Sequence, residues 1–240
     1  MTSYHPYSIF PLGDSALVID FGNIIDEDLN KKVYSLYNLI KNSSISHIVD
    51  LIPAYSSLAV YYELHAFYQK NGHEKTAFEA IAEKVEELTN NDHQTIDKSG
   101  RTFRIPVCYS EQYGLDLQEL AQKKNLAIEE VIELHTAKSY RVFMIGFLPG
   151  FTYMGKVDDR IVLPRRDKPK KVLPGAVGIA GNQTGVYPLS SPGGWNIIGR
   201  TPVSLFDKEK TDPVLFQAGD EVTFYSITED EFEHYQIGNS

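Results

Sequence analysis

The segment from residue 149 to residue 202 constrains the fold more than any other part of this 240-residue chain. It holds nine of the 17 glycines and seven of the 12 prolines, with phenylalanine, tyrosine and tryptophan interspersed among them. Aromatic side chains need burial or a binding partner, so this is not the composition of a disordered linker. Glycine permits positive φ and close backbone approach, whereas proline stiffens the chain. The segment therefore predicts tight turns between short strands, a rigid preformed binding surface, or both.

Short β-branched and aromatic runs around these turns predict a barrel. The expected strands are residues 103–109, 177–180, 197–198, 203–206 and 222–227. Two helices are expected after the first of them. Asp116 and Glu119 would cap a helix that runs to Lys124, and the next helix would carry His135 on its apolar face. Short strands between Gly and Pro turns are typical of a closed or nearly closed β-barrel.

The first 98 residues predict a small α+β domain with the order ββαββα. The expected strands are residues 7–10, 16–21, 45–52 and 58–62. Asp26 and the two acidic residues after it would start the first helix, where the helix dipole favours negative charge. The second helix begins with Thr76 and Glu79 at the spacing of a capping box. We expect two layers, with the helices on one face of the sheet.

A polar stretch over residues 89–100 predicts a linker, and we place the domain boundary near residue 98. This gives a domain of residues 1–98 with a net charge of −7 and a barrel domain of residues 99–240 with a net charge of −2. All seven arginines lie in the second domain. The whole chain carries a net charge of −9, which argues against a general nucleic-acid binder.

The expected compartment is the cytoplasm. Residues 1–6 lack the basic and apolar regions of a signal peptide, and no apolar run approaches the roughly 18 residues that span a bilayer. The single cysteine, Cys108, lies in an apolar run, so we expect a buried thiol in a reducing environment.

Motifs of common active sites are weak or missing. Residues 150–157 have the glycine and lysine spacing of a Walker A loop, but Val157 replaces the Ser or Thr that would bind magnesium. The seven histidines show no metal-ligand spacing, so no metal site is expected, and there is no Gly-x-Ser-x-Gly elbow. His135 is expected to pack within its helix face with hydrogen bonds, and a catalytic role is the alternative.

A basic stretch follows the Walker-like residues. Its members are Lys156, Arg160, Arg165, Arg166, Lys168, Lys170 and Lys171. One interpretation is a solvated loop. The other is a site for a carboxylate, a phosphate or an acidic partner, because the planar fork of arginine binds such groups bidentately.

Three long motifs resemble one protein family. Residues 146–155 (GFLPGFTYMG), 177–188 (VGIAGNQTGVYP) and 191–202 (SPGGWNIIGRTP) are similar to those of the family of the 5-oxoprolinase B subunit. This family is also called allophanate hydrolase subunit 1, or the Kip-type sporulation kinase inhibitor family. The chain departs from the family pattern at Lys170, where an arginine is usual, and over residues 172–177 (VLPGAV).

The resemblance implies a cyclophilin-like barrel after a ββαββα domain, and it implies two competing functions. In the first, the chain is one subunit of a bacterial ATP-dependent 5-oxoprolinase, which converts 5-oxoproline to L-glutamate. Its partners would be an allophanate hydrolase subunit 2-like chain (the C subunit of 5-oxoprolinase) and a LamB/YcsF-type chain (the A subunit of 5-oxoprolinase). In the second, the chain inhibits a sporulation histidine kinase by binding its dimerisation and phosphotransfer helices. A weaker third possibility is a carboxyltransferase part like that of urea carboxylase.

The two main functions need different residues. Lactam ring opening needs a carboxylate clamp and donors to the amide, for which Arg200, Thr201, Gln183 and Tyr187 are candidates. We expect ATP to be used by the assembled complex and not bound by this chain alone. A kinase inhibitor needs an exposed aromatic hot spot instead. The remaining candidates for a binding site or interface are Phe147, Phe151, Tyr153, Trp195, Arg165 and His135.

Overall fold

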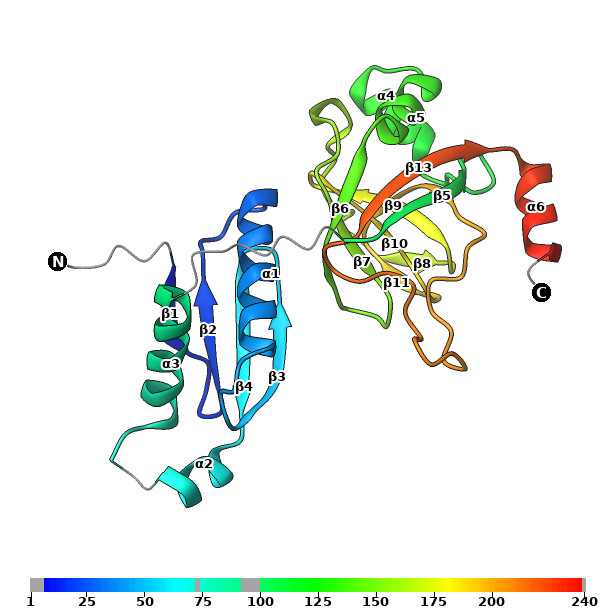
Figure 1. Cartoon of the computed structure of the whole chain (residues 1–240). Coiled ribbons are helices and arrows are strands. Elements are labelled where there is room, and N and C mark those ends of the chain that lie inside the picture. Colours follow the sequence, from blue (N-terminus) through cyan, green and yellow to red (C-terminus); the bar gives the residue numbers. More distant parts are fainter. Residues whose placement is uncertain (1–6, 72–73, 92–99, 239–240) are drawn as a thin grey trace. The chain divides into compact units, whose positions relative to one another are not determined.

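The computed structural model of the chain describes residues 7–71, 74–91 and 100–238. They form two compact units, Met1–Lys98 and Ser99–Ser240, each described separately below (Figure 1). Residues 1–6 and most of the predicted linker over residues 89–100 lie outside the described residues. Among the described residues, no helix combines the length and the apolar character that crossing a membrane requires.

The first unit is a four-stranded antiparallel sheet with helices. Its elements are β1 (Ser8–Pro11), β2 (Ala16–Asp20), α1 (Glu27–Lys41), β3 (Ile48–Pro53), β4 (Ser57–Tyr62), α2 (Leu64–Asn71) and α3 (Ala77–Asn91). The strand order in the sheet is β1-β2-β4-β3. The observed order has one element more than the predicted ββαββα, because the short helix α2 lies between β4 and α3.

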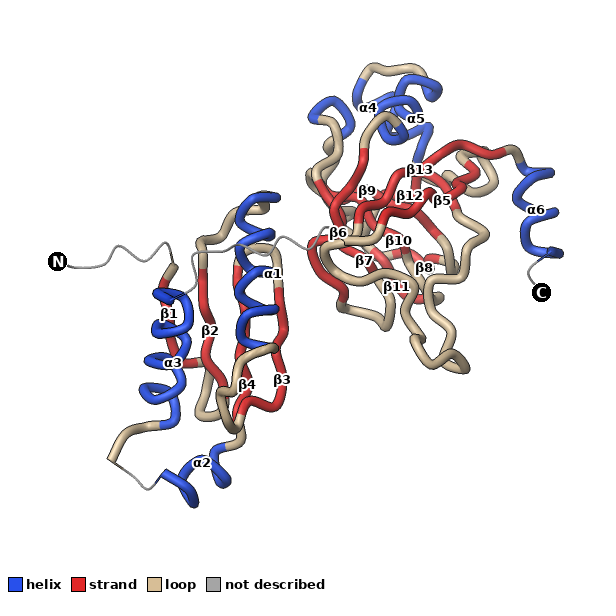
Figure 2. The backbone as a smooth tube through the Cα atoms, viewed as in Figure 1, coloured by secondary structure: helices blue, strands red, loops and turns tan. Residues whose placement is uncertain are grey.

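Local signals start the two long helices of this unit. The Asp26 side chain accepts hydrogen bonds from the backbone N–H groups of Asp28 and Leu29, which caps α1. The Thr76 backbone N–H donates to the Glu79 carboxylate, and the Glu79 N–H donates to the Thr76 hydroxyl. This pair is the capping box predicted from the sequence. Both helices pack on one side of the sheet, as the tube view shows (Figure 2).

The second unit is a closed seven-stranded barrel. Its elements are β5 (Thr102–Cys108), α4 (Leu117–Lys124), α5 (Ile128–Thr136), β6 (Ser139–Ile145), β7 (Thr152–Gly155), the 3-10 turn η1 (Asp159–Ile161), β8 (Lys170–Val172), β9 (Ala176–Ala180), β10 (Gln183–Val186), β11 (Ser191–Gly193), β12 (Asn196–Arg200), β13 (Glu221–Ile227) and α6 (Glu229–Gly238). The barrel order is β10-β7-β6-β13-β5-β12-β9, and β8 pairs with β11 in a separate small sheet. A closed barrel is the fold that the family resemblance implies for this part.

Strand alternation gives the barrel unit two apolar clusters. Val177 and Ile179 of β9 point into the barrel core, whereas Ala176 and Ala180 of the same strand join a second cluster on its outer face. Cys108 is buried, as its apolar surroundings predict. The Walker-like residues enter strand β7 rather than a loop that opens a helix, which agrees with the exclusion of a P-loop.

Two predictions for this unit were wrong, and several of its elements were not predicted, among them β6, β7 and β10. Asp116 precedes α4, but its side chain makes no capping hydrogen bond, because the carboxylate is turned to partners far away in the sequence. Residues 203–206 do not form a strand. Phe206 makes only an isolated bridge to Val214. The C-terminal helix α6 was not expected, although Thr228 and Glu231 cap it by the same box as in α3.

Candidate functional site

Five of the predicted aromatic residues form one contiguous group on the outer face of the barrel. This aromatic cluster consists of Phe147, Phe151, Tyr153, Tyr187 and Trp195. Its centre is the buried ring of Phe151, whose centroid lies 4.7 Å from that of Tyr153, 4.9 Å from Tyr187 and 5.4 Å from Trp195. All three contacts are edge-to-face, the arrangement that the aromatic quadrupole favours.

Two glycines explain how Trp195 fits against the barrel. Gly178 of β9 and Gly185 of β10 are opposite each other in the ladder. A Cβ atom at Gly185 would lie 3.0 Å from Trp195 Cζ3, and one at Gly178 would lie 3.1 Å from Trp195 Cβ. A side chain at either position would crowd the indole. Gly178 and Gly185 of the second motif therefore favour close packing of the cluster.

Phe147 is the exposed member of the cluster. Its side chain is 64% exposed although its ring touches Phe151 at a centroid distance of 5.7 Å. Its backbone has a φ of 70°, and the Leu148 N–H donates to the Gly146 carbonyl at 2.9 Å across it. This is a tight γ-type turn, a strained conformation for a residue with a large side chain. The turn holds an apolar ring outward.

A cleft of about 580 Å³ lies beside β12 and α4. We call it the basic cleft. Its lining residues are Glu119, Lys123, Leu163, Pro164, Arg165, Arg166, Asp167, Lys168, Lys170 and Asn196. Five of these side chains are cationic and two are carboxylates. The basic stretch of the sequence thus forms one wall of a concave site, and helix α4 contributes Glu119 and Lys123.

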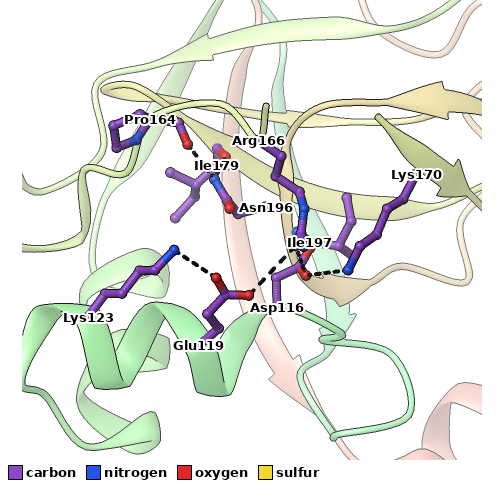
Figure 3. A network of polar contacts seen from close by, with 9 residues as sticks. All are labelled: Asp116, Glu119, Lys123, Pro164, Arg166, Lys170, Ile179, Asn196 and Ile197. Carbon is purple, nitrogen blue, oxygen red and sulfur yellow. Dashed lines mark hydrogen bonds and ion pairs between the residues drawn. The ribbon is translucent and has the colours of Figure 1, made fainter. Parts of the chain in front are cut away.

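Asp116 pairs with two cations that line this cleft (Figure 3). Its carboxylate forms an ion pair with Arg166, and Lys170 Nζ lies 3.8 Å away. The same carboxylate accepts a hydrogen bond of 2.8 Å from the Ile197 backbone N–H. Asp116 is only 4% exposed, and these partners compensate its buried carboxylate. This pairing fixes Arg166 against β12.

Contacts of Glu119 and Asn196 complete the network in Figure 3. Glu119 accepts a hydrogen bond from Lys123 at 2.7 Å and lies 3.9 Å from Arg166. The pKa of Glu119 is lowered, chiefly by the Lys123 hydrogen bond. The Asn196 side-chain amide donates to the carbonyls of Pro164 and Ile179 and ties the cleft wall to the barrel. Both acidic side chains next to Arg166 are therefore engaged in ion pairs.

Arg165 connects the basic cleft to the aromatic cluster. A Cβ at Gly194 would lie 3.3 Å from Arg165 Nη2, so the guanidinium rests against that glycine. Burial raises the pKa of Tyr153 and of Tyr187, and the Arg165 charge opposes this in both. A hydrogen bond from the Trp195 backbone also lowers the pKa of Tyr187. Both phenols are neutral near pH 7.

The other four candidates do not join this group. His135 is fully buried in the barrel core, where Nδ1 is 2.7 Å from the Tyr109 hydroxyl and Nε2 is 2.9 Å from the Thr184 hydroxyl. Its ring stacks on Phe224. Burial lowers the pKa of His135 to about 3. These contacts match the packed, hydrogen-bonded histidine expected from the helix pattern.

Arg200 and Thr201 lie at the far end of β12. Arg200 Nε donates to the Pro174 carbonyl at 2.8 Å, and its guanidinium faces the rings of Tyr113 and Phe232. Thr201 is 2% exposed and its hydroxyl accepts from the Val203 N–H. Gln183 begins β10, and its buried Nε2 has no hydrogen-bond partner among the described residues.

Residue patterns did not predict the role of Asp116, Asn196, Glu119 or Lys123 in the cleft. Asp116 and Glu119 had a local explanation as helix caps, which concealed their long-range partners. As a whole, the basic cleft offers several cations in a concave site, a combination suited to holding an anion. Among the described residues, no group of three or more His, Cys, Asp or Glu side chains could hold a metal ion.

Comparison with known proteins gives consistent matches. The family model for the carboxyltransferase domain, subdomain C and D, matches residues 7–216. The chain is 40% identical over 232 residues to the B subunit of 5-oxoprolinase from Bacillus subtilis, covering 96% of this chain and 97% of that protein. It is 42% identical to a conserved uncharacterized protein of known structure from Pyrococcus horikoshii, with a TM-score of 0.54 and coverage of 94% and 100%. The structure of TTHA0988 is 31% identical with a TM-score of 0.74, but the match spans 88% of this chain and 40% of that longer one.

Proposed function

The chain belongs to the family of the 5-oxoprolinase B subunit, and from that premise we propose that it is one subunit of an ATP-dependent 5-oxoprolinase. One observation carries this proposal: the 40% identity to a protein of that name extends over 96% of this chain and 97% of that one. The substrate is 5-oxoproline, the product is L-glutamate, and ATP is consumed by the assembled complex.

The site supports a binding role for this subunit. Opening a lactam requires that its carboxylate be held and its amide oxygen be activated so that water can attack the carbonyl carbon. Asp116 behind the basic cleft and Glu119 within it are engaged in ion pairs, whereas Asp167 lines the cleft without an ion pair among the described residues. The cations of the cleft are suited to holding the substrate carboxylate. In this proposal, other chains supply part of the reacting groups.

The proposed partners are an allophanate hydrolase subunit 2-like chain and a LamB/YcsF-type chain. TTHA0988 supports a close partnership, because the part similar to this chain is 40% of a longer polypeptide. When a segment is covalently joined to further sequence in one relative, the same segment as a separate chain is expected to associate with a chain that carries the remainder.

Reconstitution tests the proposed function. The chain is purified alone and after co-expression with the two partner chains, and ATP hydrolysis is measured with and without 5-oxoproline. We expect 5-oxoproline-dependent ATP hydrolysis and glutamate release only from the complex. Omission of this chain from the co-expression is the matched control. A stable complex that hydrolyses no ATP in response to 5-oxoproline would overturn the proposal.

A second candidate function is inhibition of a histidine kinase, and Phe147 is the observation that favours it. An exposed ring held outward by a strained turn is a suitable hot spot for docking on a helical partner. This function predicts that the isolated chain slows kinase autophosphorylation and that Phe147→Ala abolishes the effect. No inhibition at saturating chain would exclude it.

A further inference from the structure

The basic cleft contains two kinds of cation. Arg166 and Lys170 are held by Asp116, and Lys123 is held by Glu119. Arg165 and Lys168 line the same cleft, and neither has a carboxylate within ion-pair distance among the residues that the structure describes. The positive charge that remains available to a ligand therefore belongs to Arg165 and Lys168, and the carboxylate of Asp167, which lines the same cleft, offsets part of it.

Arg165 is the better placed of the two. Its guanidinium rests against the Gly194 backbone and is close enough to the Tyr153 and Tyr187 phenols to influence their pKa values. An exposed guanidinium with an unused fork can donate two parallel hydrogen bonds to one oxyanion. The neighbouring Arg166 is less available, because its Nη1 is already paired with Asp116.

The wall behind Arg165 is fixed before any ligand arrives. The Arg166 backbone N–H donates to the Gly194 carbonyl at 2.7 Å, and Asn196 is 4% exposed with both of its amide donor contacts satisfied. These contacts hold the segment that carries Arg165 against β12. A site that is rigid in advance loses less entropy when it binds a small molecule.

We propose that the basic cleft is a binding site for a small oxyanion, and that Arg165 is the residue that anchors it. The oxyanion is the carboxylate of 5-oxoproline or glutamate, or else a phosphate group. The choice of those carboxylates rests on the proposed function, whereas the oxyanion chemistry rests on the cleft alone.

A titration of the full chain followed by amide NMR tests this assignment directly. The probes are sodium 5-oxoproline, sodium glutamate and sodium phosphate, with sodium chloride at matched ionic strength as the blank. We expect saturable shifts at the amides of Gly194 and Asn196. Tighter binding of 5-oxoproline or glutamate than of phosphate would assign the site to the substrate carboxylate, and the reverse order would assign it to a phosphate group.

Two arginine variants make the test specific. Arg165→Gln should weaken binding at least about tenfold, the loss expected for charge-assisted hydrogen bonds. Arg104→Gln is the matched control, because Arg104 is also exposed on the barrel but stacks on Tyr225 outside the cleft. Equal affinities for wild type and Arg165→Gln, equal losses in both variants, or no saturable shift with any probe would overturn the proposal.

The outcome can be separated from that of the proposed function. If the chain shows no Arg165-dependent binding while the reconstituted complex still hydrolyses 5-oxoproline, only the cleft assignment is wrong. If the chain binds an oxyanion through Arg165 and the complex shows no 5-oxoproline-dependent ATP hydrolysis, the proposed function is wrong and the oxyanion site stands.

Discussion

Gly185 carries no side chain, and this allows Trp195 to pack closely against the barrel. A Cβ there would lie 2.5 Å from the Thr152 carbonyl oxygen and 3.0 Å from Trp195 Cζ3. The first of these neighbours is backbone and cannot move aside at low cost. The aromatic cluster therefore depends on the residue type at a position that contributes no contact surface of its own.

We expect Gly185→Ala to lower the free energy of unfolding of the barrel unit by about 1–3 kcal/mol, the usual cost of overpacking. Gly146→Ala is the matched control. Its added Cβ would lie 3.8 Å from Met144 Cε, an ordinary contact, so we expect a change within about 0.5 kcal/mol. Urea unfolding followed by tryptophan fluorescence measures both, since Trp195 is the only tryptophan. Equal stability of the two variants would contradict this account of the cluster.

His135 should make stability depend on pH below neutrality. Its pKa is about 3 in the folded chain, against 6.5 for an unperturbed histidine. Between these values the unfolded chain binds a proton that the folded chain does not, so stability falls as pH is lowered from about 6.5 towards 3. Above pH 6.5 the residue adds no pH dependence.

His135 can change the free energy of unfolding by at most about 1.4 kcal/mol per pH unit. Urea unfolding of wild type and His135→Gln at about pH 7 and about pH 5.5 isolates it, because all other titrating groups are shared. The variant should lose less stability on acidification, whatever its stability at pH 7. Parallel losses in the two proteins would show that His135 is protonated in the folded state.

Residue types in the sequence selected candidate site residues, but they did not predict how those residues are arranged. The aromatic residues, Arg165 and the basic stretch could be selected from composition and spacing. The Asp116 network could not, because its partners Arg166 and Ile197 are 50 and 81 positions away in the sequence. Nothing in the neighbourhood of an aspartate before a helix distinguishes a cap from a buried ion pair. Only tertiary structure brings these residues together.

At the scale of elements, helices were predictable where their start signals are local. Asp26 and Thr76 cap α1 and α3 through residues within three positions, so the sequence shows both partners. Apolar runs predicted four of the seven barrel strands, β5, β9, β12 and β13, but not β6, β7 or β10, and they wrongly predicted a strand at residues 203–206. That run is apolar because Leu205 is buried in the core, although it pairs with no neighbouring strand. A short apolar run has the same sequence pattern whether its residues are buried in a loop or paired in a strand.

Helix α6 allows a test of capping at the level of one element. Thr228 and Glu231 form its capping box, and Phe232 in its first turn is 1% exposed. Thr228→Ala should destabilise the helix by about 1 kcal/mol, which corresponds to roughly fivefold faster amide hydrogen exchange in residues 231–235. Glu231→Gln keeps the acceptor of the box and should change exchange much less. Unchanged exchange in Thr228→Ala would mean that Phe232 alone holds the helix.

At the scale of the whole chain, the charge difference and the polar stretch predicted two parts, and the observed packing has separate cores. Leu58 and Val60 belong to a core made only of residues from the first unit. Leu120 and Val142 belong to a core made only of residues from the second. The sequence could not show that the barrel closes, because closure depends on pairing β10 with β9 and β7 and joining β5 to both β12 and β13. Those pairings are set by register between distant segments.

Separate cores predict two unfolding transitions. Leu58→Ala and Leu120→Ala each remove a fully buried side chain, one from each core, and each should cost about 2–5 kcal/mol. In scanning calorimetry, Leu58→Ala should lower the midpoint of one transition and Leu120→Ala that of the other, with the second transition unmoved in each case. The two leucines are matched in type and exposure, so a difference in which peak moves reflects location alone. A single transition that shifts equally in both variants would show that the two units unfold as one cooperative body. The stability of the oxyanion site would then depend on the first unit as well as on the barrel unit.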